Sequence, residues 1–297
     1  MPATAIKPAS AIAPPTETAA RIGQWQLVRM IGEGQLCRVY AARPVSQAAE
    51  RAAVYALKVL SDRWSEDSAA IEVLRREAIV GRTLSHPHLV SVLSAHVAAP
   101  PYFLVMPLLE GLALSQRLAG GDRLSLPMAL WIARQTAEAL DALHQAGWMH
   151  ADVKPSNLFL SPDGHVTLLD LGFARRPDDT TSIINRCVTG TMHYIAPEMI
   201  TSALRPDIRS DLYSLGATLY ELLTGRPPFV ARSLEQLADL HRQGEPEPLR
   251  MLTPTVPATV ARFVHQMLSK QPLRRPQTPT EVIDRLVTLE IETFNLR

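Results

Sequence analysis

The run His150-Ala151-Asp152-Val153-Lys154-Pro155-Ser156-Asn157 is the most informative stretch of this chain. It places a carboxylate, an ammonium group and an amide in one loop, at Asp152, Lys154 and Asn157. Chance assembly of these groups at this spacing is improbable. The run therefore marks a candidate site of chemistry.

Thirteen residues after Asn157 comes a second acidic motif, Asp170-Leu171-Gly172. Two short apolar runs, 158–160 and 166–168, lie between the motifs and flank the turn sequence 162–165, which predicts a hairpin. Such a hairpin brings Asn157 and Asp170 to the same end. Their amide and carboxylate oxygens are ligands suited to a hard cation such as Mg²⁺.

Composition excludes several classes of protein. The 297 residues are 46% apolar, and 30 basic against 29 acidic residues leave a formal net charge of +1, so no broad basic field is present to hold nucleic acid or an anionic membrane. No apolar run approaches the roughly 20 residues that span a bilayer, and no secretory signal peptide is evident. Two cysteines, Cys37 and Cys187, exclude a disulfide scaffold or a Cys-rich zinc module. We expect a soluble, cytoplasmic globular protein.

The chain divides by pattern into an α+β arrangement of two lobes. Residues 1–22 are rich in Ala and Pro without periodicity, which predicts a disordered tail. A strand-rich lobe is expected over 23–107 and a helical lobe over 108–290, with a hinge near 107–111 and a C-terminal tail over 291–297.

Individual elements follow from the spacing of apolar residues. In the first lobe we expect strands at 26–31, 38–42, 54–60, 91–96 and 102–106. One helix, 67–84, is expected among them, with Ile71, Leu74, Ala78 and Arg82 on one face. In the second lobe, Pro127 opens a helix that Gly147 ends, and further helices are expected at 210–224, 233–243, 258–269 and 279–289.

Two motifs of the first lobe are weak when taken alone. Gly32-Glu33-Gly34, followed by Val39, is either an ordinary tight hairpin or a turn whose backbone approaches phosphate oxygens. Lys58 ends a strand, where a lysine is usually a solvated charge. Glu77, nineteen residues later, is either a surface carboxylate beside arginines or the partner of Lys58.

Together these motifs resemble the protein kinase superfamily, in its bacterial Ser/Thr branch, over about residues 25–290. The resemblance implies a two-lobed protein kinase fold, ATP and Mg²⁺ (or Mn²⁺) as cofactors, and transfer of the γ-phosphoryl group to Ser/Thr hydroxyls of proteins. It implies that Lys58 holds the α- and β-phosphates and pairs with Glu77. Asp152 would accept or orient the proton of the attacking hydroxyl, and Lys154 would neutralise γ-phosphoryl charge. Asn157 and Asp170 would ligate the metal.

The same resemblance implies where the nucleotide lies. Met106 corresponds to the gatekeeper, and adenine would meet the carbonyl of Pro107 and the N–H of Leu109. Proline at position 107 lacks only the backbone N–H donor, and the nucleotide does not need a donor from this residue. The full set of implied nucleotide contacts is Ile31, Gly32, Gly34, Val39, Ala56, Lys58, Glu77, Met106, Pro107 and Leu109.

Later motifs agree with the resemblance. Glu198, in Ala196-Pro197-Glu198, would pair with Arg275, and Asp211 would brace the catalytic loop. Thr191 resembles the threonine that Ser/Thr kinases set beside the catalytic aspartate and lysine, which favours Ser/Thr acceptors over Tyr. We therefore count Thr191 with the catalytic residues.

Three departures from the family pattern stand out: Cys37 for the third loop glycine, Ala151 for arginine, and Leu171 for phenylalanine. Leu171 keeps the apolar packing. Cys37 is either a stiffening of the loop or a small packed thiol. Cys37 and Ala151 are the support for an alternative function, a pseudokinase acting as a nucleotide-binding scaffold.

Ala151 bears on regulation. In kinases with arginine there, a phosphate on the activation segment pairs with it and orders the segment. Here we expect ordering by packing or by a regulatory protein partner instead. The candidate phosphosites are Thr180, Thr181, Ser182 and Thr189, and the cations that could substitute are Arg175, Arg176 and Arg186.

Overall fold

The computed structural model describes residues 20–47, 52–121, 123–177, 179, 191–200 and 205–294. Most of the predicted tail, 1–19, lies outside this part, as do all four candidate phosphosites and Arg186. Strand β1 (Arg21–Ile22) falls within the predicted tail and pairs with the next strand, so the prediction of disorder up to residue 22 is wrong for these two residues.

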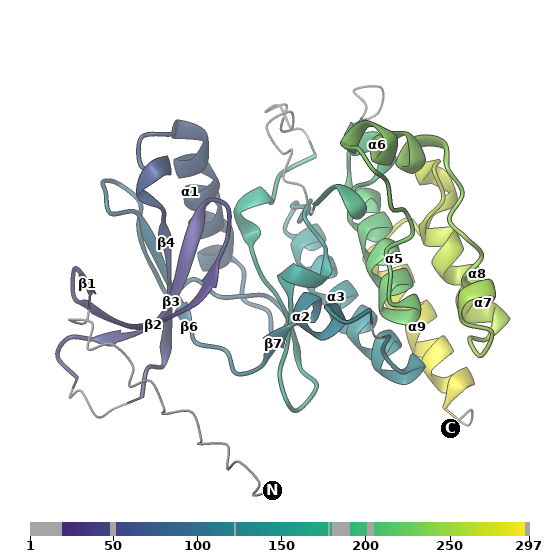
Figure 1. Ribbon diagram of the computed structural model, residues 1–297, viewed down its shortest axis with the longest axis horizontal. Coiled ribbons are helices and arrows are strands. Elements are labelled where there is room, and N and C mark those ends of the chain that lie inside the picture. Colours follow the sequence, from purple (N-terminus) through teal and green to yellow (C-terminus); the bar gives the residue numbers. More distant parts are fainter. Residues whose placement is uncertain are drawn as a thin grey trace, which may run out of the picture.

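A six-stranded antiparallel sheet forms the first lobe, in the order β1-β2-β3-β4-β6-β5 (Figure 1). Successive residues of a strand face opposite sides, so Leu57 packs with Trp25, Ala42 and Val105 while Ala56 joins the core on the other side. The remaining strands are β2 (Trp25–Glu33), β3 (Cys37–Pro44), β4 (Tyr55–Leu60), β5 (Ser94–His96) and β6 (Phe103–Pro107).

The strand expected over 91–96 is shorter than predicted. The strand itself is Ser94–His96, and Leu93 before it still donates its N–H to the Val105 carbonyl oxygen of β6 at 2.8 Å. Val92 instead donates its N–H to the carbonyl of Gly81, at 2.9 Å, and is 5% exposed. Contact with the end of a helix thus removes the first residues of this apolar run from the sheet.

Helix α1 (Ser68–Thr83) packs beside the sheet and begins after Asp67, whose Oδ1 accepts from the Ala70 N–H at 2.8 Å. Ile71, Leu74 and Ala78 are buried, as predicted. Arg82 is exposed, so its assignment to the apolar face is wrong, and Glu77 is buried at 1% exposure. A helix that buries a carboxylate must supply it with a partner.

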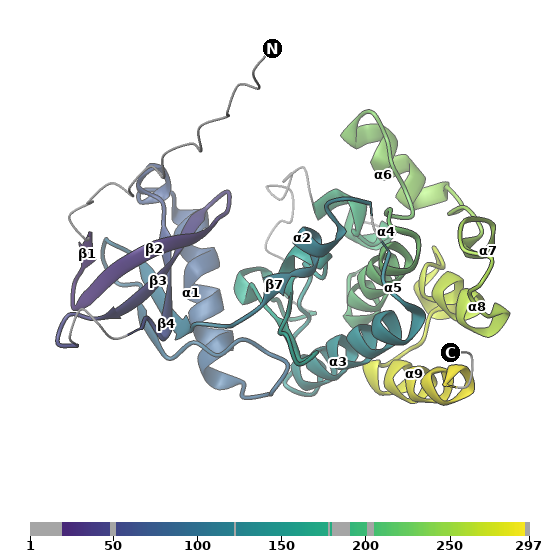
Figure 2. The same cartoon turned by 60° about the horizontal axis from the view of Figure 1, so that its bottom comes forward.

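The second lobe surrounds helix α5 (Ile208–Thr224), which has 14 buried residues among its 17 (Figures 1 and 2). A helix that is apolar all round lies inside a bundle. The predicted helices are all present, with ends shifted by a few residues. The helix expected at 258–269 ends early, at Met267, and the last helix ends late, at Thr293. Their bounds are α3 (Leu126–Gln145), α6 (Leu234–Gln243), α8 (Ala258–Met267) and α9 (Pro279–Thr293).

Short elements complete the lobe. The predicted hairpin is confirmed as β8 (Leu158–Leu160) and β9 (Val166–Leu168), with Leu158 opposite Leu168. The other short elements were not predicted, because two to five residues are too few for the apolar pattern to repeat. They are β7 (Leu112–Ala113), α2 (Leu114–Leu118), α4 (Pro197–Ile200) and α7 (Leu249–Leu252), together with 3₁₀ turns at η1 (Asp62–Trp64), η2 (Pro155–Asn157), η3 (Leu171–Phe173), η5 (Thr191–His193) and η6 (Pro272–Arg274).

Candidate active site

Lys58 joins the two lobes at the candidate site. Its Nζ lies 2.6 Å from Glu77 Oε2 on α1 and 2.8 Å from Asp170 Oδ1. The predicted Lys58–Glu77 pairing is therefore confirmed. Burial opposes the charge on Lys58, but the charges of Asp170 and Glu77 outweigh it and raise the pKa of the ammonium. Burial also raises the pKa of Glu77 to about 7, against the opposing charge of Lys58.

Gly172 allows α1 to approach the acidic motif closely. A Cβ on Gly172 would lie 2.6 Å from Val73 Cγ1 and 3.0 Å from the Val73 carbonyl oxygen, both on α1. A contact of 2.6 Å is shorter than real Cβ atoms show, and the carbonyl oxygen at 3.0 Å is also tight. A larger residue would therefore force Val73 of α1 to shift.

In the loop of Asp152, two further polar side chains, Lys154 and Asn157, contact the Asp152 carboxylate. Lys154 Nζ lies 2.9 Å from Asp152 Oδ2, and Asn157 Nδ2 donates to the carbonyl and to Oδ2 of Asp152, each at 2.8 Å. Asp152 is 4% exposed and Asn157 6% exposed. The amide nitrogen of Asn157 is thus engaged, and its oxygen is the atom that could ligate a metal.

His150, which the sequence pattern did not single out, connects this loop to the acidic motif. Its Nδ1 accepts from the Asp152 N–H at 3.2 Å, and its Nε2 lies 3.0 Å from the Leu169 carbonyl oxygen. Burial lowers the pKa of His150, so a neutral ring with its proton on Nε2 satisfies both contacts. The imidazole thus fixes Asp152 relative to Leu169, the residue before Asp170.

Backbone strain concentrates at the same place. Ala151 and Asp170 are the non-glycine residues of the described chain with positive φ, 63° and 65°. Asp211, 0% exposed on α5, accepts from the N–H groups of His150 and Ala151 at 2.6 and 2.7 Å. These bonds hold the strained turn, which confirms that Asp211 braces the loop.

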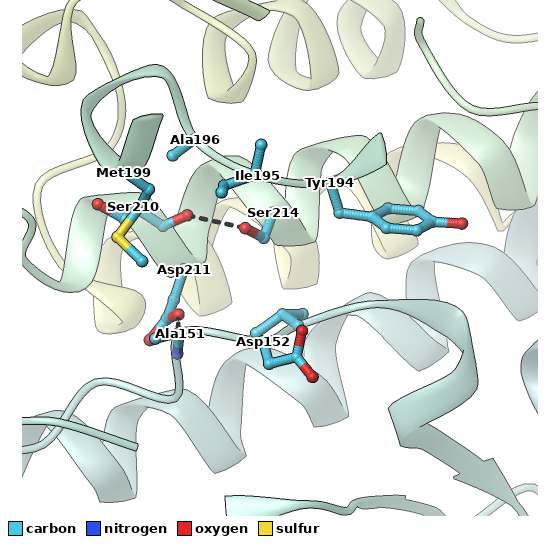
Figure 3. Close-up of a pocket in the computed structure, with 10 residues that line it drawn as sticks. Ala151, Asp152, Tyr194, Ile195, Ala196, Met199, Ser210, Asp211 and Ser214 are labelled. Carbon is cyan, nitrogen blue, oxygen red and sulfur yellow. Dashed lines mark hydrogen bonds between the residues drawn. The ribbon is translucent and has the colours of Figure 1, made fainter. Parts of the chain in front are cut away.

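A crevice beside Asp152 is bounded by Ala151 and Asp211 on one side and by residues 194–196 on the other (Figure 3). Tyr194 is tied to α5 by its hydroxyl, which donates to Glu221 Oε2 at 2.5 Å. Sequence reasoning missed this contact, because nothing in either local pattern pairs the two residues. Thr191 begins η5 nearby, and its side chain lies outside the described residues.

The glycine turn lies between β2 and β3, where Gly32 is opposite Val39. A Cβ on Gly32 or Gly34 would meet its neighbours only at ordinary distances, 3.9 and 3.5 Å. The packing of the described chain therefore does not require glycine at these two positions. Cys37 lies in the core, and burial raises the pKa of its thiol to about 12, which favours the interpretation of a packed, unreactive thiol.

Of the other positions assigned to the nucleotide, Ala56 and Met106 are opposite each other on β4 and β6 and are buried, while Ile31 is 37% exposed on β2. Pro107 is opposite Tyr55, and the next residue donates its N–H to the Val54 carbonyl oxygen. Alternation along an antiparallel ladder therefore places Pro107 at a non-hydrogen-bonded pair. Its carbonyl points away from β4, and the missing N–H costs no ladder bond. Leu109 follows the strand, half-buried.

Glu198 and Arg275 form a buried ion pair, as predicted. Arg275 Nη1 and Nη2 lie 2.6 and 2.8 Å from the two Glu198 carboxylate oxygens. Both residues are almost fully buried, at 2% and 4% exposure, and Ser210 donates to Glu198 at 2.6 Å. The bidentate geometry ties α4 to the segment before α9.

The residues present fit a divalent cation that arrives with phosphate. Within the described chain, no group of three His, Cys, Asp or Glu residues could enclose a metal. Magnesium commonly takes one or two protein oxygens and completes its shell with phosphates and water. Asp170 and Asn157 supply that number, and their backbones are linked through the bond from the Leu169 N–H to the Asn157 carbonyl oxygen at 2.8 Å.

A strand-rich lobe and a helical lobe thus bring a Lys–Glu–Asp cluster opposite an Asp–Lys–Asn loop, the arrangement of a phosphoryl-transfer site. The family described as protein kinase domain matches residues 25–286, and the chain belongs to this family. No described helix is long and apolar enough to cross a bilayer.

Several bacterial proteins are similar to this chain. The serine/threonine-protein kinase PrkC of Bacillus subtilis is 32% identical over 88% of the chain and 39% of its own length. The serine/threonine-protein kinases PknD and PknA of Mycobacterium tuberculosis are 31% and 35% identical, over 87% and 85% of the chain and 38% and 58% of their own lengths. The chain thus spans well under two thirds of these relatives. None of these names favours a scaffold without catalysis.

Proposed function

We propose that this chain is a protein serine/threonine kinase that transfers the γ-phosphoryl group of ATP to Ser/Thr hydroxyls of proteins. The observation that carries the proposal is the pairing of Lys58 with both Glu77 and Asp170, opposite a loop in which Lys154 and Asn157 surround Asp152. A purely structural role would not need to bury this many charges in a cleft, because each costs desolvation free energy.

Each group has a distinct task in this proposal. The Lys58 ammonium holds the α- and β-phosphates, and Glu77 holds Lys58. Asp152 accepts or orients the proton of the acceptor hydroxyl. Lys154 offsets charge on the moving phosphoryl group. Catalysis is then positioning and electrostatic stabilisation by preorganised groups.

A divalent cation, which we propose to be Mg²⁺ with Mn²⁺ as substitute, is held by Asn157 and Asp170 and neutralises phosphate charge when bound. The nucleotide lies over Gly32 and Gly34. Its adenine is proposed to contact the Pro107 carbonyl and the Leu109 N–H, with Ile31, Val39, Ala56 and Met106 around the ring.

Serine and threonine acceptors are proposed on the basis of Thr191, which follows Gly190 and precedes the Ala196-Pro197-Glu198 motif. We further propose a cytoplasmic location, where ATP and Mg²⁺ are supplied, and regulation by a protein partner. The balanced charge and the two cysteines are compatible with that compartment.

The test is transfer of label from γ-labelled ATP, both to the protein itself and to a generic protein substrate. We expect phosphoserine and phosphothreonine in the wild-type products and no label in the Asp152→Asn variant. Binding of nucleotide without any turnover, across divalent cations and substrates, would contradict the proposal.

A further inference from the structure

Asp179, nine residues after Asp170, lies between two arginines from different parts of the molecule. Its Oδ2 is 3.4 Å from Arg76 Nη1 on α1, and these side chains are 23% and 21% exposed. Arg175 donates from Nη2 to the Asp179 carbonyl oxygen. The two contacts attach one residue both to α1 and to the chain leaving the acidic motif.

Arg175 needs a nearby negative charge. It is 5% exposed, and its Nε and Nη1 have no hydrogen-bond partner in the described part of the chain. Burial lowers the pKa of Arg175, the charge of Arg76 lowers it further, and the charge of Asp179 opposes both. A negative charge near two guanidinium groups offsets their mutual repulsion.

Among the described residues, the lining of the surrounding groove supplies little other negative charge. Its lining includes Arg176, whose guanidinium stacks on Trp148 with its carbon 4.9 Å from the ring centroid, and one further acid, Glu72. Counting Arg76, Arg175 and Arg176 against Asp179 and Glu72 leaves an excess of one positive charge. Asp179 is the acid placed between Arg76 and Arg175.

Both arginines connect directly to the active site. Arg76 precedes Glu77, the residue that orients Lys58. The backbone of Arg175 exchanges two hydrogen bonds with Met149, at 2.8 and 2.9 Å, and Met149 precedes His150. Asp179 contacts Arg76 through its carboxylate and Arg175 through its carbonyl oxygen, and it therefore couples the position of α1 to the loop of Asp152.

We propose that Asp179 is a positioning residue that contacts Arg76 through its carboxylate and Arg175 through its carbonyl oxygen, and so holds α1 where Glu77 meets Lys58. Its permanent carboxylate thereby orders the segment, as a phosphate does in kinases where it pairs with an arginine at position 151. Ala151 offers no such arginine in this chain. The inference rests on the proposed kinase function for its kinetic consequence, and on the geometry alone for its effect on α1.

The kinetic test compares Asp179→Asn, which removes the charge at constant shape, with Asp179→Glu, which keeps it. We expect kcat to fall by about three- to tenfold in the Asn variant with the KM of the protein substrate unchanged, because fewer molecules hold α1 in place. The Glu variant should recover most of the loss. The matched control Asp239→Asn, on an exposed Arg242–Asp239 pair of α6, should leave kcat unchanged.

Coupling is tested by combining Asp179→Asn with Arg76→Gln. The double variant should be hardly slower than either single variant, because both remove the same link. Multiplicative losses, or full activity in Asp179→Asn, would overturn the proposal. So would a collapse of activity in the triple variant Thr180→Ala, Thr181→Ala, Ser182→Ala that acidic replacements rescue, since phosphate would then do the ordering.

Hydrogen exchange separates this inference from the proposed function. Amides of residues 68–83 should exchange faster in Asp179→Asn than in wild type and Asp239→Asn, whether or not the protein transfers phosphate. Absence of turnover in wild type together with this difference would refute the kinase proposal and keep the link. Unchanged exchange in α1 would refute the link.

Discussion

Asp152 shows at the residue scale how one carboxylate organises the loop around it. Asp152→Asn removes its charge and keeps its shape, so we expect the fold to persist while kcat for phosphotransfer falls about a thousandfold. Labelled-phosphate transfer measures the loss, and thermal unfolding checks the fold. Robust activity of the variant, purified free of other kinases, would show that Asp152 is not the group that handles the hydroxyl proton.

Lys58 is the counter-charge of two carboxylates. Lys58→Met should abolish phosphotransfer, because neither the phosphates nor Glu77 then meets an ammonium group. We expect the protein to stay folded, since Glu77, with its pKa already raised to about 7 by burial, can take up a proton and become neutral. Circular dichroism and nucleotide binding of the variant and of wild type at pH 6 and pH 8 test this. A variant that loses more structure than wild type between pH 8 and pH 6 would contradict it.

Metal removal tests the oxygen ligands. Activity should vanish with a chelator and return with added Mg²⁺, because Asn157 and Asp170 complete a cation shell only together with phosphate oxygens. Asp170→Ala should abolish activity at any Mg²⁺ concentration, as it removes both a ligand and a partner of Lys58. Turnover that survives chelation would exclude this assignment.

At the scale of elements, the packing of α6 on α5 buries an ionisable ring. His241 is 0% exposed, its Nδ1 lies 2.9 Å from the Tyr213 hydroxyl, and burial together with the charge of Lys270 lowers its pKa to about 3. A folded-state pKa below the unfolded value means that the unfolded chain binds more protons. Stability is therefore lost as the pH falls below the unfolded pKa of about 6.5.

Protonation of His241 in the unfolded chain should thus lower the free energy of unfolding by about 2 kcal/mol between pH 7 and pH 5. Urea unfolding at the two pH values measures this. His241→Gln should lose that amount of pH dependence, although His150, whose pKa burial also lowers, keeps part of the slope. The exposed His144→Gln variant should retain the full slope. Equal slopes in wild type and His241→Gln would contradict the prediction.

For the whole molecule, the Glu198–Arg275 pair joins α4 to the segment that precedes α9. Glu198→Gln should lower the unfolding free energy by about 3–5 kcal/mol, because it leaves a buried guanidinium without its anion. Glu247→Gln breaks a half-exposed pair with Arg226 and should cost less than about 1 kcal/mol. Urea denaturation of both variants measures the difference. Equal effects would mean that burial does not govern this pair.

Local pattern was sufficient to predict much of this molecule. Apolar spacing predicted the two lobes and their long helices, because the period of apolar residues can be seen within a few consecutive turns of the chain. The run from His150 to Asn157 and the Asp170 motif revealed the candidate site because their groups are neighbours in the chain. The family resemblance added the pairings of Lys58 with Glu77 and of Glu198 with Arg275.

Only the tertiary structure decided which distant groups meet. Glu77 reads locally as a surface carboxylate beside arginines, yet packing of α1 on η3 buries it against Lys58. No sequence signal joins Tyr194 to Glu221, or His150 to the Leu169 carbonyl, and none places Asp179 at Arg76. The physical reason is that backbone propensity and apolar periodicity act over neighbouring residues, whereas a buried charge finds its partner only when separate elements pack.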